Sequence, residues 1–128
     1  MPVRGLGDYD SDNIFAKILR NEIPSRRIYE DDFAIAFHDI NPQAPIHILV
    51  IPRTPHISLA DFATTAPPET VAGFFRAVAL VARQLNLEDP GYRILANMGH
   101  HAHQEVPHFH VHIFGGRPLG HMLPPLPG

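Results

Sequence analysis

Three histidines alternate with apolar residues in the stretch Pro107-His108-Phe109-His110-Val111-His112-Ile113-Phe114, which Gly115-Gly116-Arg117 follows. Alternation with a period of two is typical of a half-buried β-strand, so the stretch is expected to form one. In such a strand the histidines share one exposed face, with neighbours about 6–7 Å apart, and the apolar residues face a core. Three aligned imidazoles on an exposed face have no obvious value for stability. We therefore expect the chemistry of the protein here.

The bulk composition narrows the class of protein. A chain of 128 residues is expected to form one domain. The formal net charge is −3 and Lys17 is the only lysine, so no basic stripe for nucleic acid is visible. The absence of cysteine excludes disulfides and thiol catalysis and fits a cytoplasmic protein. No signal peptide or bilayer-length apolar run is present, so no membrane partner is expected.

Hydrophobic periodicity in the rest of the chain predicts an α+β fold. A short helix capped by Asp12 carries the apolar residues from Ile14 to Leu19, and the longest helix begins at Pro67-Pro68-Glu69. Only one helical turn, near 59–62, is expected between them. Strands are expected at 27–30, 33–38, 46–52, 92–97 and 107–114. Short connections between these elements favour a five-stranded antiparallel sheet with two helices packed against it.

The two ends of the chain differ from the middle. Residues 1–12 are rich in glycine and aspartate and are expected to form a flexible N-terminal arm. Residues 13–128 are expected to form a single domain that ends in a proline-rich tail, because proline cannot extend a sheet.

The alternating histidines allow three interpretations. The first is a structural one, in which the rings are solvated or lie at the edge of the core. The second is a metal site, since catalytic zinc often has three protein ligands, although no cysteine or well-spaced carboxylate pair accompanies these histidines. The third is nucleophilic attack on phosphorus by a neutral imidazole, with neighbouring rings holding phosphate oxygens or protonating the leaving group. We favour the third, with the middle histidine, His110, as nucleophile.

Other polar residues fit this third interpretation. The amide of Gln104, which precedes Glu105, can donate a hydrogen bond to a phosphate or leaving-group oxygen. Asp39 ends a strand and can accept hydrogen bonds from ribose hydroxyls, or it is simply a turn residue. His47 lies in an apolar strand, where a histidine is usually structural unless that strand adjoins the triple-histidine strand. Neither a P-loop nor a dinucleotide fingerprint is present, which gives no support to an ATPase or a Rossmann oxidoreductase.

The sequence resembles the histidine-triad (HIT) superfamily and, within it, the Hint branch of histidine-triad nucleotide-binding proteins. The resemblance covers residues 13–120 and depends on the combination of motifs rather than on the three histidines alone. Besides the triad stretch, the matching motifs are Ile14-Phe15-Ala16-Lys17-Ile18, Glu22-Ile23-Pro24, Phe37-His38-Asp39-Ile40-Asn41-Pro42-Gln43-Ala44-Pro45, His47-Ile48-Leu49-Val50-Ile51-Pro52, Gln104-Glu105-Val106 and Gly115-Gly116-Arg117.

This resemblance implies a homodimer whose two sheets join into one, and metal-independent hydrolysis of nucleoside 5′-phosphoramidates and aminoacyl-adenylates that releases AMP or GMP. By position, His110 would form a covalent nucleotidyl-histidine, His112 would hold the α-phosphate, and His47 and His108 would support them. Asp39 would bind the ribose hydroxyls. The base pocket would comprise Ile14, Phe15, Ile18, Phe37, His38 and Ile40, and the phosphate end would comprise Asn97, Gln104, Glu105 and Val106.

One position departs from the family pattern. The family usually has glycine before the glutamine of the Gln104-Glu105-Val106 motif, whereas this chain has His103. A side chain there is expected to narrow the site or add a cation, and it is strained if the backbone has positive φ. Two alternatives to a phosphoramidase stay open. They are a dinucleoside polyphosphate (Ap3A or Ap4A) hydrolase using the same histidines, and a non-catalytic histidine-rich module that binds nucleotide or metal.

Overall fold

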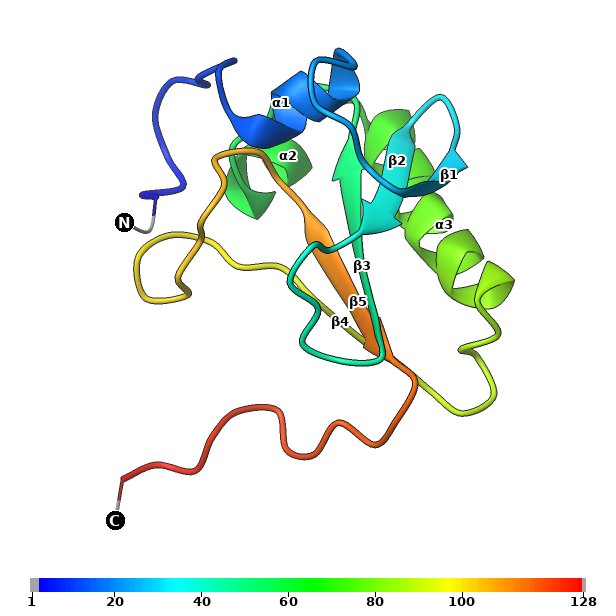
Figure 1. The fold of residues 1–128 in the computed structure, drawn as a ribbon. Coiled ribbons are helices and arrows are strands. Elements are labelled where there is room, and N and C mark those ends of the chain that lie inside the picture. Colours follow the sequence, from blue (N-terminus) through cyan, green and yellow to red (C-terminus); the bar gives the residue numbers. More distant parts are fainter. Residues whose placement is uncertain (1–2, 128) are drawn as a thin grey trace.

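The fold combines five strands and three helices in a computed structural model that describes residues 3–127 (Figure 1). The ends of the predicted arm and tail, residues 1–2 and 128, lie outside the described residues. In chain order the elements are α1 (Ile14–Leu19), β1 (Arg27–Glu30), β2 (Ala34–His38), β3 (Ile46–Pro52), α2 (Leu59–Thr65), α3 (Pro68–Gln84), β4 (Arg93–Leu95) and β5 (Val111–Gly115). The predicted α+β class is confirmed. The prediction of two helices is wrong, because the turn expected near 59–62 extends into α2.

The strands form one antiparallel sheet in the order β1-β2-β3-β5-β4, which confirms the predicted sheet. Strand β3 is central and is buried at every position after Ile46, which explains its uninterrupted apolar sequence. The pairing of β3 with β5 sets Leu49 opposite His112 and His47 opposite Phe114. His47 and His112 are therefore diagonal neighbours on one face, within reach of each other.

Helix α3 covers the opposite face of the sheet from those histidines. Its apolar side chains pack on the sheet and form a hydrophobic layer between helix and sheet. A cluster of aromatic rings extends this layer to α2. In this cluster Phe62 of α2 stacks on Phe109 with ring centroids 5.0 Å apart, and Phe74 of α3 lies 5.4 Å from Phe109. Because Phe109 stands between His108 and His110 in the chain, this packing also fixes the backbone of the triad.

The histidine face of the sheet is covered as well. Helix α1 packs Phe15 and Ile18 against Ile35, Phe37, Leu49 and Ile51. Its N-cap is Asn13, whose Oδ1 accepts a hydrogen bond from the Ala16 N–H, and not the predicted Asp12. The expectation of an exposed histidine face is therefore wrong: His108 is fully buried and His110 is only 7% exposed.

The strand of the triad is shorter than its alternation predicts. Strand β5 begins at Val111, so that His108 and His110 precede it. The Phe109 N–H donates to the carbonyl of His56, 2.7 Å away, instead of joining the sheet ladder. The alternation of side chains is nevertheless kept, since Phe109, Val111 and Ile113 all lie in the α3 layer. Strand β4 is likewise limited to Arg93–Leu95.

The N-terminal segment contacts the domain along the loop that precedes the triad. The Val3 N–H donates to the Gln104 carbonyl at 2.7 Å, and the Tyr9 hydroxyl reaches His108. The flexibility of residues 1–12 stays a prediction. At the other end, the tail leaves the body of the molecule and exposes Met122, Leu123 and Leu126 (Figure 1). Among residues 3–127, no helix has both the length and the apolar character needed to cross a bilayer.

Candidate active site

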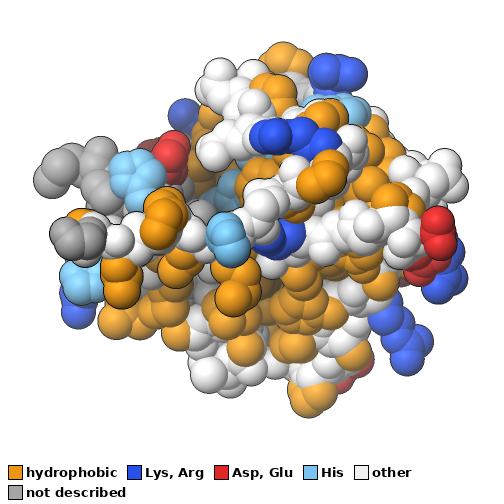
Figure 2. Space-filling view, turned by 90° about the horizontal axis from the view of Figure 1, so that it is seen from below, with side chains coloured by type: hydrophobic (Ala, Val, Ile, Leu, Met, Phe, Trp, Pro, Cys, Tyr) orange, Lys and Arg blue, Asp and Glu red, His pale blue; other side chains and the backbone are white. Residues whose placement is uncertain are grey.

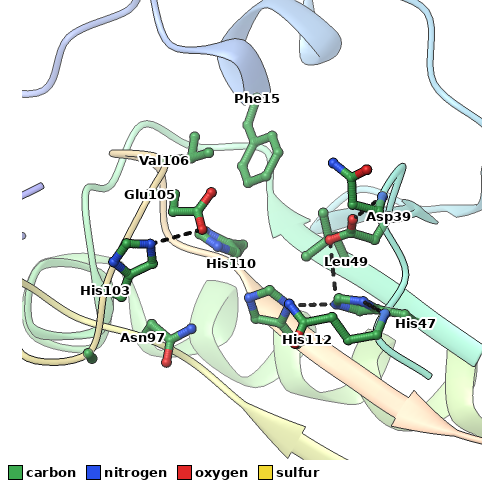
Figure 3. A pocket seen from close by; sticks show the side chains of 13 residues that line it. Phe15, Asp39, His47, Leu49, Asn97, His103, Glu105, Val106, His110 and His112 are labelled. Carbon is green, nitrogen blue, oxygen red and sulfur yellow. Dashed lines mark hydrogen bonds and ion pairs between the residues drawn. The ribbon is translucent and has the colours of Figure 1, made fainter. Parts of the chain in front are cut away.

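A pocket of about 300 Å³ opens beside the triad. Strands β3 and β5 supply its floor, Phe15 of α1 one wall, and the loops after β2 and before β5 its two ends. Figure 3 shows Asp39 and His47 at one end, His103 and Glu105 at the other, and His110 and His112 between them. Thirteen residues line it: Phe15, Asp39, Asn41, Gln43, His47, Leu49, Asn97, Ala102, His103, Glu105, Val106, His110 and His112.

The structure brings together eight of the predicted site residues in this pocket: Phe15, Asp39, His47, Asn97, Glu105, Val106, His110 and His112. The other predicted residues lie outside its lining, namely Ile14, Ile18, Phe37, His38, Ile40, Gln104 and His108. Among these, Ile18, Phe37 and His108 are buried behind the pocket, whereas Ile40 is 87% exposed. Apart from His103, the prediction missed four lining residues, namely Asn41, Gln43, Leu49 and Ala102, and the first two of these belong to the loop motif that carries Asp39.

The hydrogen bonding of His110 leaves one ring nitrogen bare. Its Nδ1 lies 2.7 Å from the His108 carbonyl oxygen. A carbonyl only accepts hydrogen bonds, so Nδ1 carries the proton. Burial lowers the pKa of His110, and the ring is therefore neutral near pH 7. It follows that Nε2 has a free lone pair at a pocket-lining residue.

The neighbouring His47 and His112 are joined by a hydrogen bond, and this leaves His112 with a free N–H donor where His110 has a free lone pair. The Gln43 N–H donates to Nδ1 of His47 at 3.1 Å, which places the His47 proton on Nε2. This Nε2 then donates to Nδ1 of His112, 2.9 Å away, and so leaves the proton of His112 on its own Nε2 (Figure 3). Burial lowers the pKa of His47, and it lowers that of His112 to about 3. Among the described residues, Nε2 of His112 is buried without a hydrogen-bond partner.

His108 is held away from the pocket by both of its nitrogens. Its Nε2 donates to the Pro52 carbonyl at 2.9 Å, and its Nδ1 accepts from the Tyr9 hydroxyl at 2.6 Å. Burial raises the pKa of Tyr9, which keeps the hydroxyl protonated, and lowers the pKa of His108 to about 4. Tyr9 was missed because it lies 99 positions from His108, and no local pattern connects them.

Comparison with known proteins shows the family of this chain. The pattern of the HIT domain family matches residues 20–119. The chain belongs to the HIT family. It is 55% identical to a HIT-like protein of Azospirillum brasilense over 90% of this chain and 94% of the relative. It is 46% identical to the Escherichia coli purine nucleoside phosphoramidase over 88% of this chain and 93% of the relative.

A solved structure extends the comparison to three dimensions. The HIT family hydrolase of Legionella pneumophila superimposes with a TM-score of 0.78 at 36% identity, and the match covers 84% of this chain and 95% of that one. The resemblance to the HIT family inferred from the motifs is thus confirmed.

The Gln104 side chain stabilises the loop that precedes β5 and does not line the pocket. The Gln104 amide nitrogen donates to the carbonyls of Ile57 and Val106, and its Oε1 accepts from the Gly99 N–H at 3.0 Å. Only 1% of the residue is exposed. All of these partners are backbone groups, so Gln104 fixes the path of the loop that carries His103 and Glu105.

One trio of side chains in the pocket has the composition of a metal site. Oxygen and nitrogen atoms of Asp39, His47 and His112 lie within 4.8 Å of one another. However, the Gln43 N–H occupies Nδ1 of His47, so the nitrogen that faces Asp39 and His112 is protonated. A metal ligand must offer a lone pair, and this donor set fits a metal ion poorly in the observed arrangement.

The Tyr9–His108 contact gives a stability prediction. In Tyr9→Phe the buried Nδ1 of His108 loses its donor, and we expect the free energy of unfolding to fall by about 1–3 kcal/mol. Urea denaturation at pH 7 measures this change. The matched control is Tyr92→Phe, because Tyr92 is 38% exposed and a change there is expected to stay within about 0.5 kcal/mol. Equal stabilities of Tyr9→Phe and the wild type would contradict the assignment.

The buried histidines also predict how stability depends on pH. In the unfolded chain a histidine pKa is about 6.5, whereas in the folded chain it is about 4 for His108 and about 3 for His112. Below pH 6.5 the unfolded state therefore binds more protons, and stability falls as the pH falls toward 4. Each of these histidines contributes up to about 1.4 kcal/mol per pH unit.

Urea denaturation at pH 7, 6 and 5 tests this dependence. His112→Gln removes one of the histidines whose pKa is lowered in the folded chain, so its unfolding free energy is expected to change less steeply with pH than that of the wild type. His121→Gln, at an exposed position, is the control and is expected to keep the wild-type slope. A wild-type stability that is constant from pH 7 to 5 would rule out neutral buried histidines.

Proposed function

We propose that this HIT protein hydrolyses nucleoside 5′-phosphoramidates, and related aminoacyl-adenylates, to release AMP or GMP through a nucleotidyl-histidine at His110. The observation that carries the proposal is that two neighbouring rings offer a substrate different groups, one a free lone pair and the other a free N–H donor. His110 offers a bare Nε2, and His112 offers an Nε2–H donor that no described residue occupies. The 46% identity to a protein named purine nucleoside phosphoramidase supports the choice of substrate.

In the proposed first step, Nε2 of His110 uses its lone pair to form a bond to phosphorus. The P–N bond breaks, its electron pair goes to the leaving nitrogen, and this nitrogen takes a proton from solvent. The His108 carbonyl stabilises the positive charge that develops on the His110 ring, because it accepts from Nδ1–H. His112 donates its Nε2–H to a non-bridging phosphate oxygen.

In the second step, water attacks the same phosphorus. The bond between phosphorus and Nε2 breaks, its electrons return to His110, and the proton lost by the water goes to solvent. The products are a nucleoside monophosphate and the original neutral ring. No other reactant is needed.

The remaining pocket residues suit the nucleoside part of the substrate. Asp39 stands at one end of the pocket, where Oδ1 is oriented by the Asn41 N–H at 2.8 Å. Its two carboxylate oxygens can accept hydrogen bonds from two ribose hydroxyls. Phe15, Leu49 and Val106 provide apolar lining for a base. Phe37 supports this wall from behind, since its ring centroid lies 5.6 Å from that of Phe15.

The test is AMP release from adenosine 5′-phosphoramidate by the wild type and by His110→Ala, each with and without EDTA. We expect turnover that EDTA does not affect and a loss of about 1,000-fold or more in the variant, as for other covalent nucleophiles. His101→Ala, an exposed histidine of the preceding loop, is the control and is expected to retain activity.

Other results would redirect the proposal. Undiminished activity of His110→Ala would exclude the covalent mechanism. Release of AMP from Ap3A or Ap4A, but not from the phosphoramidate, would favour the dinucleoside polyphosphate alternative. Binding of nucleotide without turnover of either substrate would indicate a binding module, and activity that EDTA removes would restore the metal site.

We also propose that the protein forms a homodimer in which β4 pairs with β4 of a second copy. Strand β4 lies at the edge of the sheet, and Ile94 on it is 46% exposed. An uncovered edge strand presents unpaired backbone groups that favour such pairing. Tyr92, next to β4, is also an exposed large hydrophobic residue, and Figure 2 shows hydrophobic side chains gathered in the lower part of the face seen there.

Sedimentation tests this assembly. The wild type is expected to have the mass of a dimer at micromolar concentration, and Ile94→Lys is expected to have that of a monomer, because a lysine charge opposes burial at the interface. Leu126→Lys, in the exposed tail, is the control. A monomeric wild type, or an Ile94→Lys variant that stays dimeric, would overturn this model of the dimer.

A further inference from the structure

His103 has a backbone conformation that few residues other than glycine adopt. Its φ is +55°, in the left-handed region, where a side chain is disfavoured. The surrounding loop enforces this turn: the His103 N–H donates to the His100 carbonyl, and the Gln104 N–H donates to that of Gly99, both at 3.1 Å. Non-glycine residues held in such conformations cluster at functional sites. The strain gives a reason to ask what the imidazole does.

The side chain of His103 lies at the end of the pocket opposite Asp39 (Figure 3). Its Nε2 is 3.3 Å from Oε1 of Glu105, and the two side chains are 71% and 74% exposed. They therefore form a solvent-accessible pair of opposite charge when the imidazole is protonated. Neither side chain is needed to satisfy the core, so both are free to meet a ligand.

The arrangement of the pocket assigns this pair to the leaving group. If Asp39 holds the ribose and His110 attacks the phosphorus, the nucleoside occupies one end of the pocket. The departing substituent on phosphorus then extends toward the other end, where His103 and Glu105 lie. This step of the argument rests on the proposed function.

The charges of the pair indicate what kind of leaving group fits. Cleavage of a P–N bond releases an amine, which becomes an ammonium group in water, and the Glu105 carboxylate can accept its hydrogen bonds. Protonated His103 can donate to an anion carried by the same group. Without His103, Glu105 would stand alone at this end and would repel an anionic leaving group.

We propose that His103 and Glu105 form a leaving-group subsite that selects phosphoramidates whose amine also bears a carboxylate, that is, N-linked amino acids. In the bound substrate the carboxylate is the charged group of the amino acid and can accept a hydrogen bond from His103, while Glu105 can accept from the nitrogen as it leaves as an amine. The His103 side chain is held at this end of the pocket by the strained turn, where glycine would leave Glu105 uncompensated.

A matched pair of substrates tests the proposal. In one, glycine is joined through its nitrogen to adenosine 5′-phosphate; in the other, glycinamide replaces glycine, so that only the carboxylate charge is lost. The measured quantity is the ratio of kcat/KM for the glycine substrate to that for the glycinamide substrate. We expect the wild type to favour the glycine substrate and His103→Gly to lower the ratio about tenfold, the effect of losing one charge-assisted hydrogen bond.

Two variants complete the experiment. His103→Gly suits the left-handed backbone, so its fold is expected to be retained. His101→Gly, in the same loop and exposed, is the control and is expected to keep the wild-type ratio. A ratio that is the same in the wild type and in His103→Gly would overturn this proposal while leaving the phosphoramidase intact. If the wild type fails to hydrolyse even unsubstituted adenosine 5′-phosphoramidate, the proposed function fails and this inference with it.

Discussion

The histidines of this site can be buried only when their rings are uncharged, and the hydrogen-bond partners around them are those that an uncharged ring requires. A neutral imidazole has one N–H and one lone pair, and inside a protein each of them requires a matching partner. The Pro52 and His108 carbonyls, the Gln43 N–H and the Tyr9 hydroxyl supply these partners. Since three of the four are backbone groups, the fold itself decides where each proton lies. The groups without a partner among residues 3–127, and so available to a substrate, are the lone pair on Nε2 of His110 and the Nε2–H of His112.

The sheet makes this arrangement possible by separating two layers along the same stretch of chain. On one face, the apolar residues between the histidines are locked by α3 and by the ring of Phe62. On the other face, Phe15 of α1 contacts the His110 ring edge-on, with centroids 4.9 Å apart. The histidine rings of the triad are therefore confined from both sides before any ligand arrives. Such preorganisation reduces the rearrangement that the proposed reaction would require.

Sequence patterns correctly predicted which face of the sheet each side chain of the triad stretch takes, but not which distant segments pack against that face. The period of two correctly separated the histidines from Phe109, Val111 and Ile113, because pleating depends on local backbone geometry. It could not show that α1 would cover the histidine face, since this depends on packing between distant segments. The roles of Tyr9 and Gln43 escaped for the same reason. The identity of the residue at 103 was visible as a departure from the family motif, but its positive φ required the structure.

The contact between Tyr9 and His108 also determines when the site can be completed during synthesis. The two residues are separated by 99 positions, and a ribosome that adds about 5–20 residues per second takes about 5–20 s to make that length of chain. Throughout this interval the Tyr9 hydroxyl lacks His108, and β3 can pair with β2 but not yet with β5. The order of translation thus places the pairing of β5 and the Tyr9–His108 contact near the end of synthesis, so that a product truncated before residue 108 would hold Asp39 and His47 but neither His110 nor His112.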